Sequence, residues 1–135
     1  MTKIRAKQIL AYVLVAFFVV GGTGNLIAPK PVADEYARWG YPGWFHFVTG
    51  CLELTSAFLM ARQSTRLMGS LLAIGIMASA TVTVFYYGEY SHAIAPLVVL
   101  SLLVLSAYFS WEQKQASNFG RHRATFYPNN QKDPS

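Results

Sequence analysis

The stretch WFHFVTGCLELTSAFLMA, residues 44–61, carries a single charged side chain, Glu53, near the middle of an otherwise uncharged run. A helix on the surface of a soluble protein would present charged residues along one face, repeating about every 3.6 residues. This stretch has no such face. It is therefore typical of a helix inside a membrane, and Glu53 must then point toward other parts of the protein rather than toward lipid.

Three further runs contain no charged residue and are long enough to cross a bilayer, at residues 9–28, 67–87 and 94–111. The hydrocarbon layer is about 30 Å thick, and a helix rises about 1.5 Å per residue. Hydrophobic residues make up 53% of the chain and charged residues only 13%, which is atypical of a soluble domain. We therefore predict an all-α protein, a four-helix transmembrane bundle within residues 1–111, with its second helix at residues 42–61.

The distribution of lysine and arginine predicts the orientation of this bundle. Nine of the eleven basic residues lie before the first helix, between the second and third, or after the fourth, and only Lys30 and Arg38 lie on the other side. Cytoplasmic loops of membrane proteins are enriched in Lys and Arg. Both termini are therefore expected to be cytoplasmic, in a bacterial cytoplasmic (inner) membrane. The net charge of +5 then reflects topology, so the lipid bilayer, and not nucleic acid, is the expected partner.

The connections between the helices differ in length. Residues 29–41, PKPVADEYARWGY, form the longest one, and we predict an ordered loop there. Residues 62–66 and 88–92 form short turns, which makes the helices that they join antiparallel neighbours. The tail, residues 112–135, is polar and poor in apolar residues, so we predict a disordered cytoplasmic extension.

Small residues recur in two of the predicted helices. In membrane proteins such residues allow two helices to approach closely. We therefore expect close helix contacts at two sets of positions, Gly21, Gly22 and Gly24 in the first helix and Gly75, Ser79 and Thr83 in the third.

A polar face runs along the second predicted helix. His46, Thr49, Gly50, Glu53 and Ser56 lie on one side of it at helical spacing. No Lys or Arg lies within the four predicted membrane helices, and burial without a basic partner disfavours the charged form of a carboxyl group. The expected partners of Glu53 are amide and hydroxyl side chains of the other helices, Asn25, Ser79, Thr83 and Ser101.

Two roles are open for Glu53. It is either a neutral residue that joins helices by a hydrogen bond, or a proton donor, proton acceptor or ligand anchor. Ionisable residues inside membranes are functional by default, so we take Glu53 and His46 as candidate catalytic residues. Aromatic residues gather on the outer side, where they could roof a pocket. The candidate ligand-binding residues are Asn25, Thr49, Ser79, Thr83, Tyr86 and Ser101.

The cysteine and histidine content argues against thiol redox chemistry and metal binding. Cys51 is the only cysteine, so the chain by itself forms neither an internal disulfide nor a two-thiol relay, and we expect a small buried residue there. Of the three histidines, His122 lies in the tail, far from His46 and His92. We therefore expect no metal site and no cofactor.

Three short motifs resemble those of the DoxX-like family of membrane proteins: VVGGTGNLIAP at residues 19–29, WGYP at 39–42 and TGCLELTSAFLMA at 49–61. Gly50 and Glu53 match the Gly-x-x-Glu signature of the family's second helix. The resemblance covers residues 5–111 and implies a compact four-helix membrane bundle. Many relatives have a lysine where this chain has Asn25, so the chain lacks that ion-pair partner for Glu53.

Three functions are open at this point. The family takes its name from a small subunit associated with a thiosulfate:quinone oxidoreductase and a terminal quinol oxidase. The resemblance thus implies an accessory or redox-associated subunit with an intramembrane polar pocket for a lipophilic molecule such as a quinone, and a partner oxidoreductase. A second hypothesis is a small membrane enzyme in which Glu53 and His46 perform acid–base isomerisation or cyclisation of a hydrophobic substrate. A third is a proton-coupled exporter of lipophilic cations. Whether the chain is an enzyme is left open.

Overall fold

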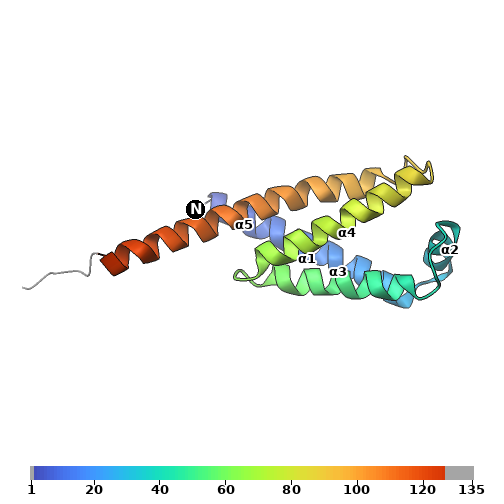
Figure 1. Cartoon of the computed structure of the whole chain (residues 1–135), viewed down its shortest axis with the longest axis horizontal. Coiled ribbons are helices and arrows are strands. Elements are labelled where there is room, and N and C mark those ends of the chain that lie inside the picture. Colours follow the sequence, from blue (N-terminus) through green and yellow to red (C-terminus); the bar gives the residue numbers. More distant parts are fainter. Residues whose placement is uncertain (1, 127–135) are drawn as a thin grey trace, which may run out of the picture.

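The chain folds into helices, with no strand in the part that the structure describes (Figure 1). The computed structural model describes residues 2–126, and it describes the side chains of residues 5–120. The helices are α1 (Thr2–Ile27), α2 (Lys30–Arg38), α3 (Phe45–Ala61), α4 (Arg66–Tyr86) and α5 (Ile94–Phe126). The prediction of an all-α protein is confirmed.

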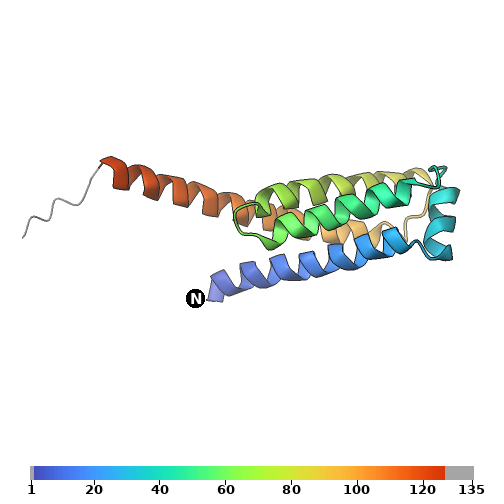
Figure 2. The ribbon, with the colours of Figure 1, turned by 90° about the horizontal axis from the view of Figure 1, so that it is seen from below.

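The four longer helices lie alongside one another, and α2 lies across one end of them (Figures 1 and 2). α3 packs against both α1 and α4, and α5 packs against α4. α1 also meets α5, where Lys7 Nζ lies 3.3 Å from Glu112 Oε2 and 4.5 Å from the ring centroid of Phe109. We call the end that carries α2 and residues 88–92 the lid end, and the end that carries residues 62–65 the turn end.

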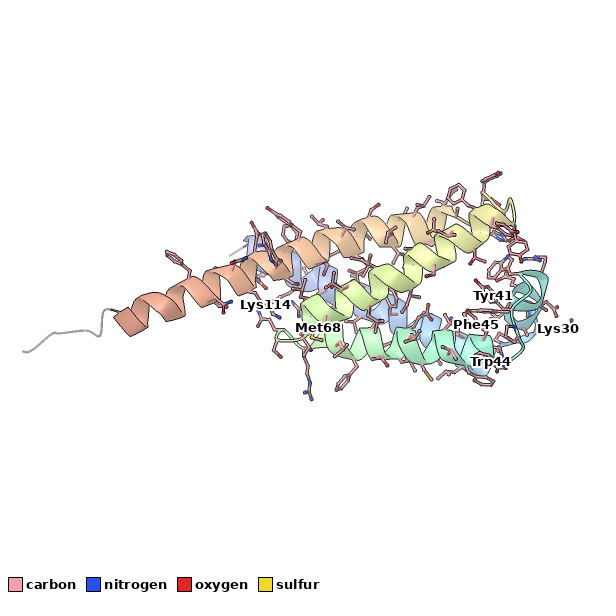
Figure 3. All side chains as sticks on the ribbon, viewed as in Figure 1. Lys30, Tyr41, Trp44, Phe45, Met68 and Lys114 are labelled. Carbon is pink, nitrogen blue, oxygen red and sulfur yellow. The ribbon has the colours of Figure 1, made fainter. Side chains whose placement is uncertain are left out.

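Three of the helices are long and apolar enough to cross a membrane, over Arg5–Ile27 in α1, Arg66–Tyr86 in α4 and Ile94–Gly120 in α5. α3 is apolar but has only 17 residues. It begins at Phe45 rather than at residue 42, because a turn closed by a 2.9 Å hydrogen bond from Phe45 N to Pro42 O precedes it. Apolar side chains project from the outer faces of these helices, as lipid-facing surfaces require (Figure 3).

The apolar core extends from the middle of the helices toward the turn end. Its fully buried large side chains are Leu14, Phe18, Met60 and Leu103. Gly69 brings α4 very close to α3, since a β-carbon added there would lie 2.6 Å from the Met60 amide nitrogen. Arg66 is buried beside this contact, and its Nε donates a hydrogen bond of 3.0 Å to Met60 O. These two contacts join α3 to α4 next to the 62–65 turn.

The predicted disorder of the tail is wrong for residues 112–126, which continue α5, whereas residues 127–135 lie outside the described part of the chain. The low apolar content of this segment predicts that it does not pack. It does not prevent helix formation, because only the first turn of a helix is costly to form and α5 already supplies it. No proline interrupts the segment before position 128.

The connection at residues 29–41 contains a helix, α2, where we predicted a loop. Pro31 lies in its first turn, where the missing N–H of proline leaves no hydrogen bond unmade. Val32, Tyr36 and Trp39 follow at helical spacing, and all three are partly buried. Contact of this stripe with the longer helices stabilises a helix too short to be stable alone.

Candidate functional site

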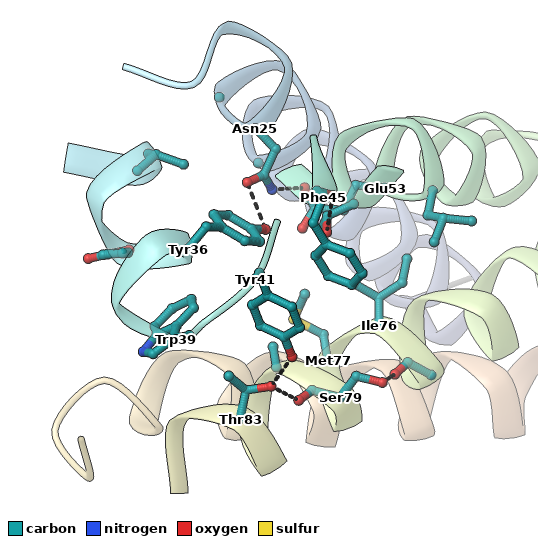
Figure 4. Close-up of a pocket in the computed structure, with 18 of the residues that line it drawn as sticks. Asn25, Tyr36, Trp39, Tyr41, Phe45, Glu53, Ile76, Met77, Ser79 and Thr83 are labelled. Carbon is teal, nitrogen blue, oxygen red and sulfur yellow. Dashed lines mark hydrogen bonds between the residues drawn. The ribbon is translucent and has the colours of Figure 1, made fainter. Parts of the chain in front are cut away.

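A cavity of about 740 Å³ lies at the lid end, between α1, α3 and α4 and beneath α2 (Figure 4). This volume is within the range of sites that bind small molecules, about 300–1,000 Å³. One wall is apolar and comes from α4, with Leu72, Ile76 and Met77. The same wall carries Gly75, beside which an added β-carbon would find no atom within 4 Å. The absence of a side chain at Gly75 therefore leaves open space in the cavity and does not serve a close contact between helices.

Glu53 lies on the buried face of α3, 5% exposed, and lines the cavity. The polar face predicted from the sequence is largely confirmed, since His46, Gly50 and Ser56 are buried with it. Gly21 of α1 makes room for the carboxyl group, because a β-carbon there would lie 3.2 Å from Glu53 Oε2. The prediction that Cys51 is buried is wrong, because its side chain points away from this face and is exposed.

Asn25 connects Glu53 to the lid end. Its Nδ2 donates a hydrogen bond of 2.8 Å to Glu53 Oε2, and its Oδ1 accepts one of 3.0 Å from the hydroxyl of Tyr36 in α2. Burial raises the pKa of the Tyr36 hydroxyl, so this group remains a donor at neutral pH. His46 Nδ1 lies 2.9 Å from the backbone oxygen of Asn25, and because a carbonyl only accepts, Nδ1 carries the proton.

The opposite side of the cavity has a second set of hydrogen bonds. The Tyr41 hydroxyl lies 2.7 Å from Thr83 Oγ1, and Thr83 Oγ1 donates to the backbone oxygen of Ser79 at 3.0 Å. Since the Thr83 proton is used in that bond, Tyr41 donates to Thr83. The Tyr41 ring also stacks on Phe45, with a centroid separation of 4.4 Å and an interplanar angle of 5°. Figure 4 shows these residues facing Asn25, Tyr36 and Glu53 across the cavity.

Polar contacts also hold the lid segment, residues 30–41, whose helix α2 has no fully buried residue. Arg38 Nε lies 2.9 Å from Glu89 Oε1, and His92 Nδ1 donates to Glu89 Oε2 at 2.9 Å. Burial acts to raise the pKa of Glu89, but the hydrogen bond from His92 and the positive charge of Arg38 outweigh it and lower that pKa. The Tyr87 hydroxyl adds a 2.7 Å bond to the backbone oxygen of Trp39.

The backbone turns sharply where the lid segment ends. Gly40 has a φ of +70°, a conformation that L side chains rarely adopt. This turn directs Tyr41 back toward α4, beside Phe45 (Figure 3). The glycine of the WGYP motif therefore positions the aromatic pair that lines the cavity.

The structure brings together five of the eight predicted site residues. Those that line the cavity are Asn25, Thr49, Glu53, Ser79 and Thr83. His46 does not line it and is bonded behind Asn25. Tyr86 is 82% exposed and Ser101 is exposed on α5, so neither reaches the cavity. Of the expected partners of Glu53, only Asn25 bonds to it, because Ser79, Thr83 and Ser101 donate to backbone oxygens of their own helices.

Four aromatic residues of the lid segment and its neighbour line the cavity, Tyr36, Trp39, Tyr41 and Phe45. Trp39 and Tyr41 belong to the outer aromatic group that we expected could roof a pocket, whereas sequence reasoning missed Tyr36 and Phe45. The spacing of Val32, Tyr36 and Trp39 is the signal that indicates an amphipathic helix there. Within the described residues no group of three or more His, Cys, Asp or Glu side chains is placed to hold a metal ion.

Residues 9–106 of the chain match the sequence pattern of the DoxX-like family, and the predicted resemblance is thereby confirmed. The match includes every helix that lines the cavity, from the second turn of α1 into α5. No curated protein and no solved structure matches the chain significantly. The comparisons thus identify a class of membrane proteins, and the choice of ligand has to be argued from the cavity.

Proposed function

The chain belongs to the DoxX-like family of membrane proteins, and we propose that it is an accessory membrane subunit that binds a lipophilic molecule in the cavity at the lid end. In this proposal α1, α3, α4 and α5 each cross the bilayer as a four-helix bundle, with both termini in the cytoplasm of a bacterial inner membrane. One observation carries the proposal. The buried carboxyl group of Glu53 lines a cavity of ligand size instead of being enclosed by packed side chains.

The charge distribution supports this topology. Nine of the eleven Lys and Arg residues belong to segments at the turn end or in the N- and C-terminal parts of the chain. α3 has 17 residues, a length of about 26 Å, which a bilayer accommodates by local thinning. Topology reporters fused within residues 29–41 and after Trp111 should lie on opposite sides of the membrane. Reporters on the same side would contradict four crossings.

The position of Glu53 supports a binding role over a purely structural one. A carboxyl group at the centre of a membrane helix costs about 2.5–3.5 kcal/mol on insertion scales. A structural link to Asn25 needs only one oxygen of the carboxylate, Oε2. The described residues offer no hydrogen bond to Oε1, which leaves it to interact with a molecule in the cavity.

The geometry does not favour the enzyme hypothesis. Acid–base chemistry by Glu53 and His46 would need both groups to reach one substrate, but His46 does not line the cavity. Its Nδ1 is also committed to Asn25 O. A quinone as ligand and an oxidoreductase as partner stay predictions from the family resemblance, and the exporter hypothesis stays a prediction that requires a cationic ligand.

Filling the cavity tests the proposal. A Gly75→Phe side chain would start from the cavity wall, where nothing lies within 4 Å of the added β-carbon, and its ring would occupy part of the cavity. The control is Ala16→Phe, on the exposed surface of α1. The purified variants in nanodiscs are titrated with a short-chain quinone and with a fluorescent dansyl probe.

We expect the wild type and Ala16→Phe to bind at least one probe saturably, and Gly75→Phe to bind it at least about tenfold more weakly, a loss of about 1.4 kcal/mol. Absence of saturable binding to the wild type, or equal binding by Gly75→Phe, would contradict a ligand site in this cavity. Thermal unfolding of all three proteins is measured alongside binding, so that a loss of binding is not caused by a loss of folded protein.

A further inference from the structure

The cavity wall has few free hydrogen-bond donors. The hydroxyl of Tyr36 donates to Asn25, and that of Tyr41 donates to Thr83. The hydroxyl groups of Thr49, Ser79 and Thr83 donate to backbone oxygens within their own helices. The hydroxyl protons of the wall are thus already bonded. Trp39 Nε1 also has no hydrogen-bond partner among the described residues, but this nitrogen is fully buried. The second amide proton of Asn25 is therefore the donor left for a ligand.

Free acceptors, in contrast, are present at two depths. Glu53 Oε1 has no hydrogen-bond partner among the described residues, and the side chain is 5% exposed. Glu35 of α2 also lines the cavity, nearer the lid, and its carboxylate forms no ion pair within the described part of the chain. The wall thus contains two carboxyl groups, and no Lys, Arg or His side chain of the described region lines it.

Aromatic rings surround the upper part of the same cavity. Tyr36 lies between Trp39 and Tyr41, with centroid separations of 5.8 and 6.0 Å, and Tyr41 stacks on Phe45. Faces of such rings attract cations when the charge lies within about 6 Å of the centroid. Figure 4 shows these rings at the side of the cavity next to α2, with Glu53 deeper between α1 and α3.

We propose that the ligand is a lipophilic amine in its protonated form, whose ammonium group donates a hydrogen bond to Glu53 Oε1 and lies within reach of the aromatic rings. The inference rests on the proposed function and narrows its ligand class. A quinone offers only acceptor oxygens and so matches an acceptor-rich wall poorly, whereas an ammonium group supplies the missing donors and the missing positive charge. The apolar α4 wall receives the hydrocarbon part of the molecule.

Three probes test the inference on the full chain in phosphatidylcholine nanodiscs, whose zwitterionic lipid does not concentrate cations at the surface. They are dansylcadaverine, which is a primary ammonium ion, its N-acetyl derivative, which is neutral and carries the same fluorophore, and ubiquinone-1. The wild type should bind the ammonium probe at least about tenfold more tightly than the acetyl probe, because hydrogen bonds to charged groups are the stronger ones.

The matched variants are Glu53→Gln and Glu112→Gln, which remove the same charge from the cavity and from the exposed Lys7 pair at the opposite end. Glu53→Gln should lose the preference for the ammonium probe and keep its affinity for the acetyl probe, and Glu112→Gln should behave as the wild type. The comparison of the three probes on the wild type needs no variant, so it tests the preference for an ammonium group even if Glu53→Gln does not fold.

The outcomes separate this inference from the proposed function. Equal affinity for the two dansyl probes, or tighter binding of ubiquinone-1 than of the ammonium probe, would mean that the cavity does not select an ammonium group. Either result would overturn the inference while leaving a ligand site. Absence of binding by all three probes would overturn the proposed function as well. A preference for the ammonium probe that survives in Glu53→Gln would refute the role of Oε1.

Discussion

The contact between α3 and α4 at the turn end and the cavity at the lid end use small residues of one helix, α4, in opposite ways. At Gly69 the missing side chain is replaced by the backbone of α3, so that an added β-carbon would lie 2.6 Å from Met60 N. At Gly75 nothing lies within 4 Å of the same atom. Our prediction that Gly75, Ser79 and Thr83 mark a close helix contact is therefore wrong.

The difference between these regions follows from the path of the two helices. α3 and α4 are joined by the 62–65 turn and by the bond from Arg66 to Met60, and they diverge from there toward the lid end (Figure 1). The lid segment and Phe45 lie in the space that opens. A small residue leaves space beside its helix. The separation of the helices at that depth decides whether a neighbouring helix fills this space or whether it stays open as a cavity.

The largest effect is expected from the same substitution at these two glycines. Gly69→Ala should lower the free energy of unfolding by about 1–3 kcal/mol, since the added atom meets a backbone that cannot rotate away. Gly75→Ala should leave stability unchanged or raise it by up to about 1 kcal/mol through helix propensity. Thermal unfolding of both variants in one detergent measures this, and equal losses would refute the contrast between the two regions.

Glu53→Leu tests whether the cavity wall itself contributes to stability. The change should cost about 1–3 kcal/mol, because Asn25 Nδ2 loses its acceptor, while Glu53→Gln retains an acceptor and should cost less. In an Asn25→Ala background Glu53→Leu should cost less than in the wild type, since residues in contact are not additive. An identical cost in both backgrounds would show that the 2.8 Å bond does not contribute.

A smaller effect is expected from the lid segment. Tyr41→Phe removes the hydroxyl that donates to Thr83 but keeps the stacking on Phe45, so the loss should be about 0.5–1.5 kcal/mol. Amide hydrogen exchange of residues 30–41 should accelerate, whereas exchange in α3 near the turn end should not change. Tyr108→Phe, on the exposed surface of α5, is the matched control. Acceleration spread evenly over all helices would contradict a locally held lid segment.

The smallest effect is a pH dependence of the same segment. The pKa of Glu89 is lowered in the folded protein, so the stabilisation by Arg38 and His92 is present above the ordinary pKa of a glutamate and is lost as the pH falls through the lowered value. Amide exchange in α2 should be faster in Glu89→Gln than in the wild type at neutral pH, and the two rates should converge in acid. A ratio that does not change with pH would exclude Glu89 as the titrating group.

The helices at residues 66–86 and 94–111 were predictable because a long uncharged run has one stable structure in lipid, where every backbone hydrogen bond must be made within the chain. α2 was not recognised, since nine residues of mixed polarity form a helix only against a surface that the local pattern does not describe. The extension of α5 to Phe126 was missed because we equated low apolar content with disorder.

The candidate site was partly predictable for a similar reason. A buried carboxyl group in an apolar segment requires polar hydrogen-bond partners. Asn25, Thr49 and Thr83 were identified as site residues from their polar side chains and their depth along the helices. Tyr86 and Ser101 were chosen by the same rule, but they point away from the cavity. Position along a helix sets depth, whereas the direction of a side chain around the helix axis depends on how the helices pack.

The sequence by itself determined that the chain is a helical membrane protein of the DoxX-like family and that the buried face of its second long helix includes Glu53, because composition and local periodicity control these properties. Only the tertiary structure decided that Asn25 bonds the carboxyl group and that Ser79 and Thr83 line a cavity. It also decided that Tyr36 and Tyr41 cover this cavity. Those contacts join residues far apart in the chain, and they depend on helix separation and rotation, which are set by the packing of the whole protein.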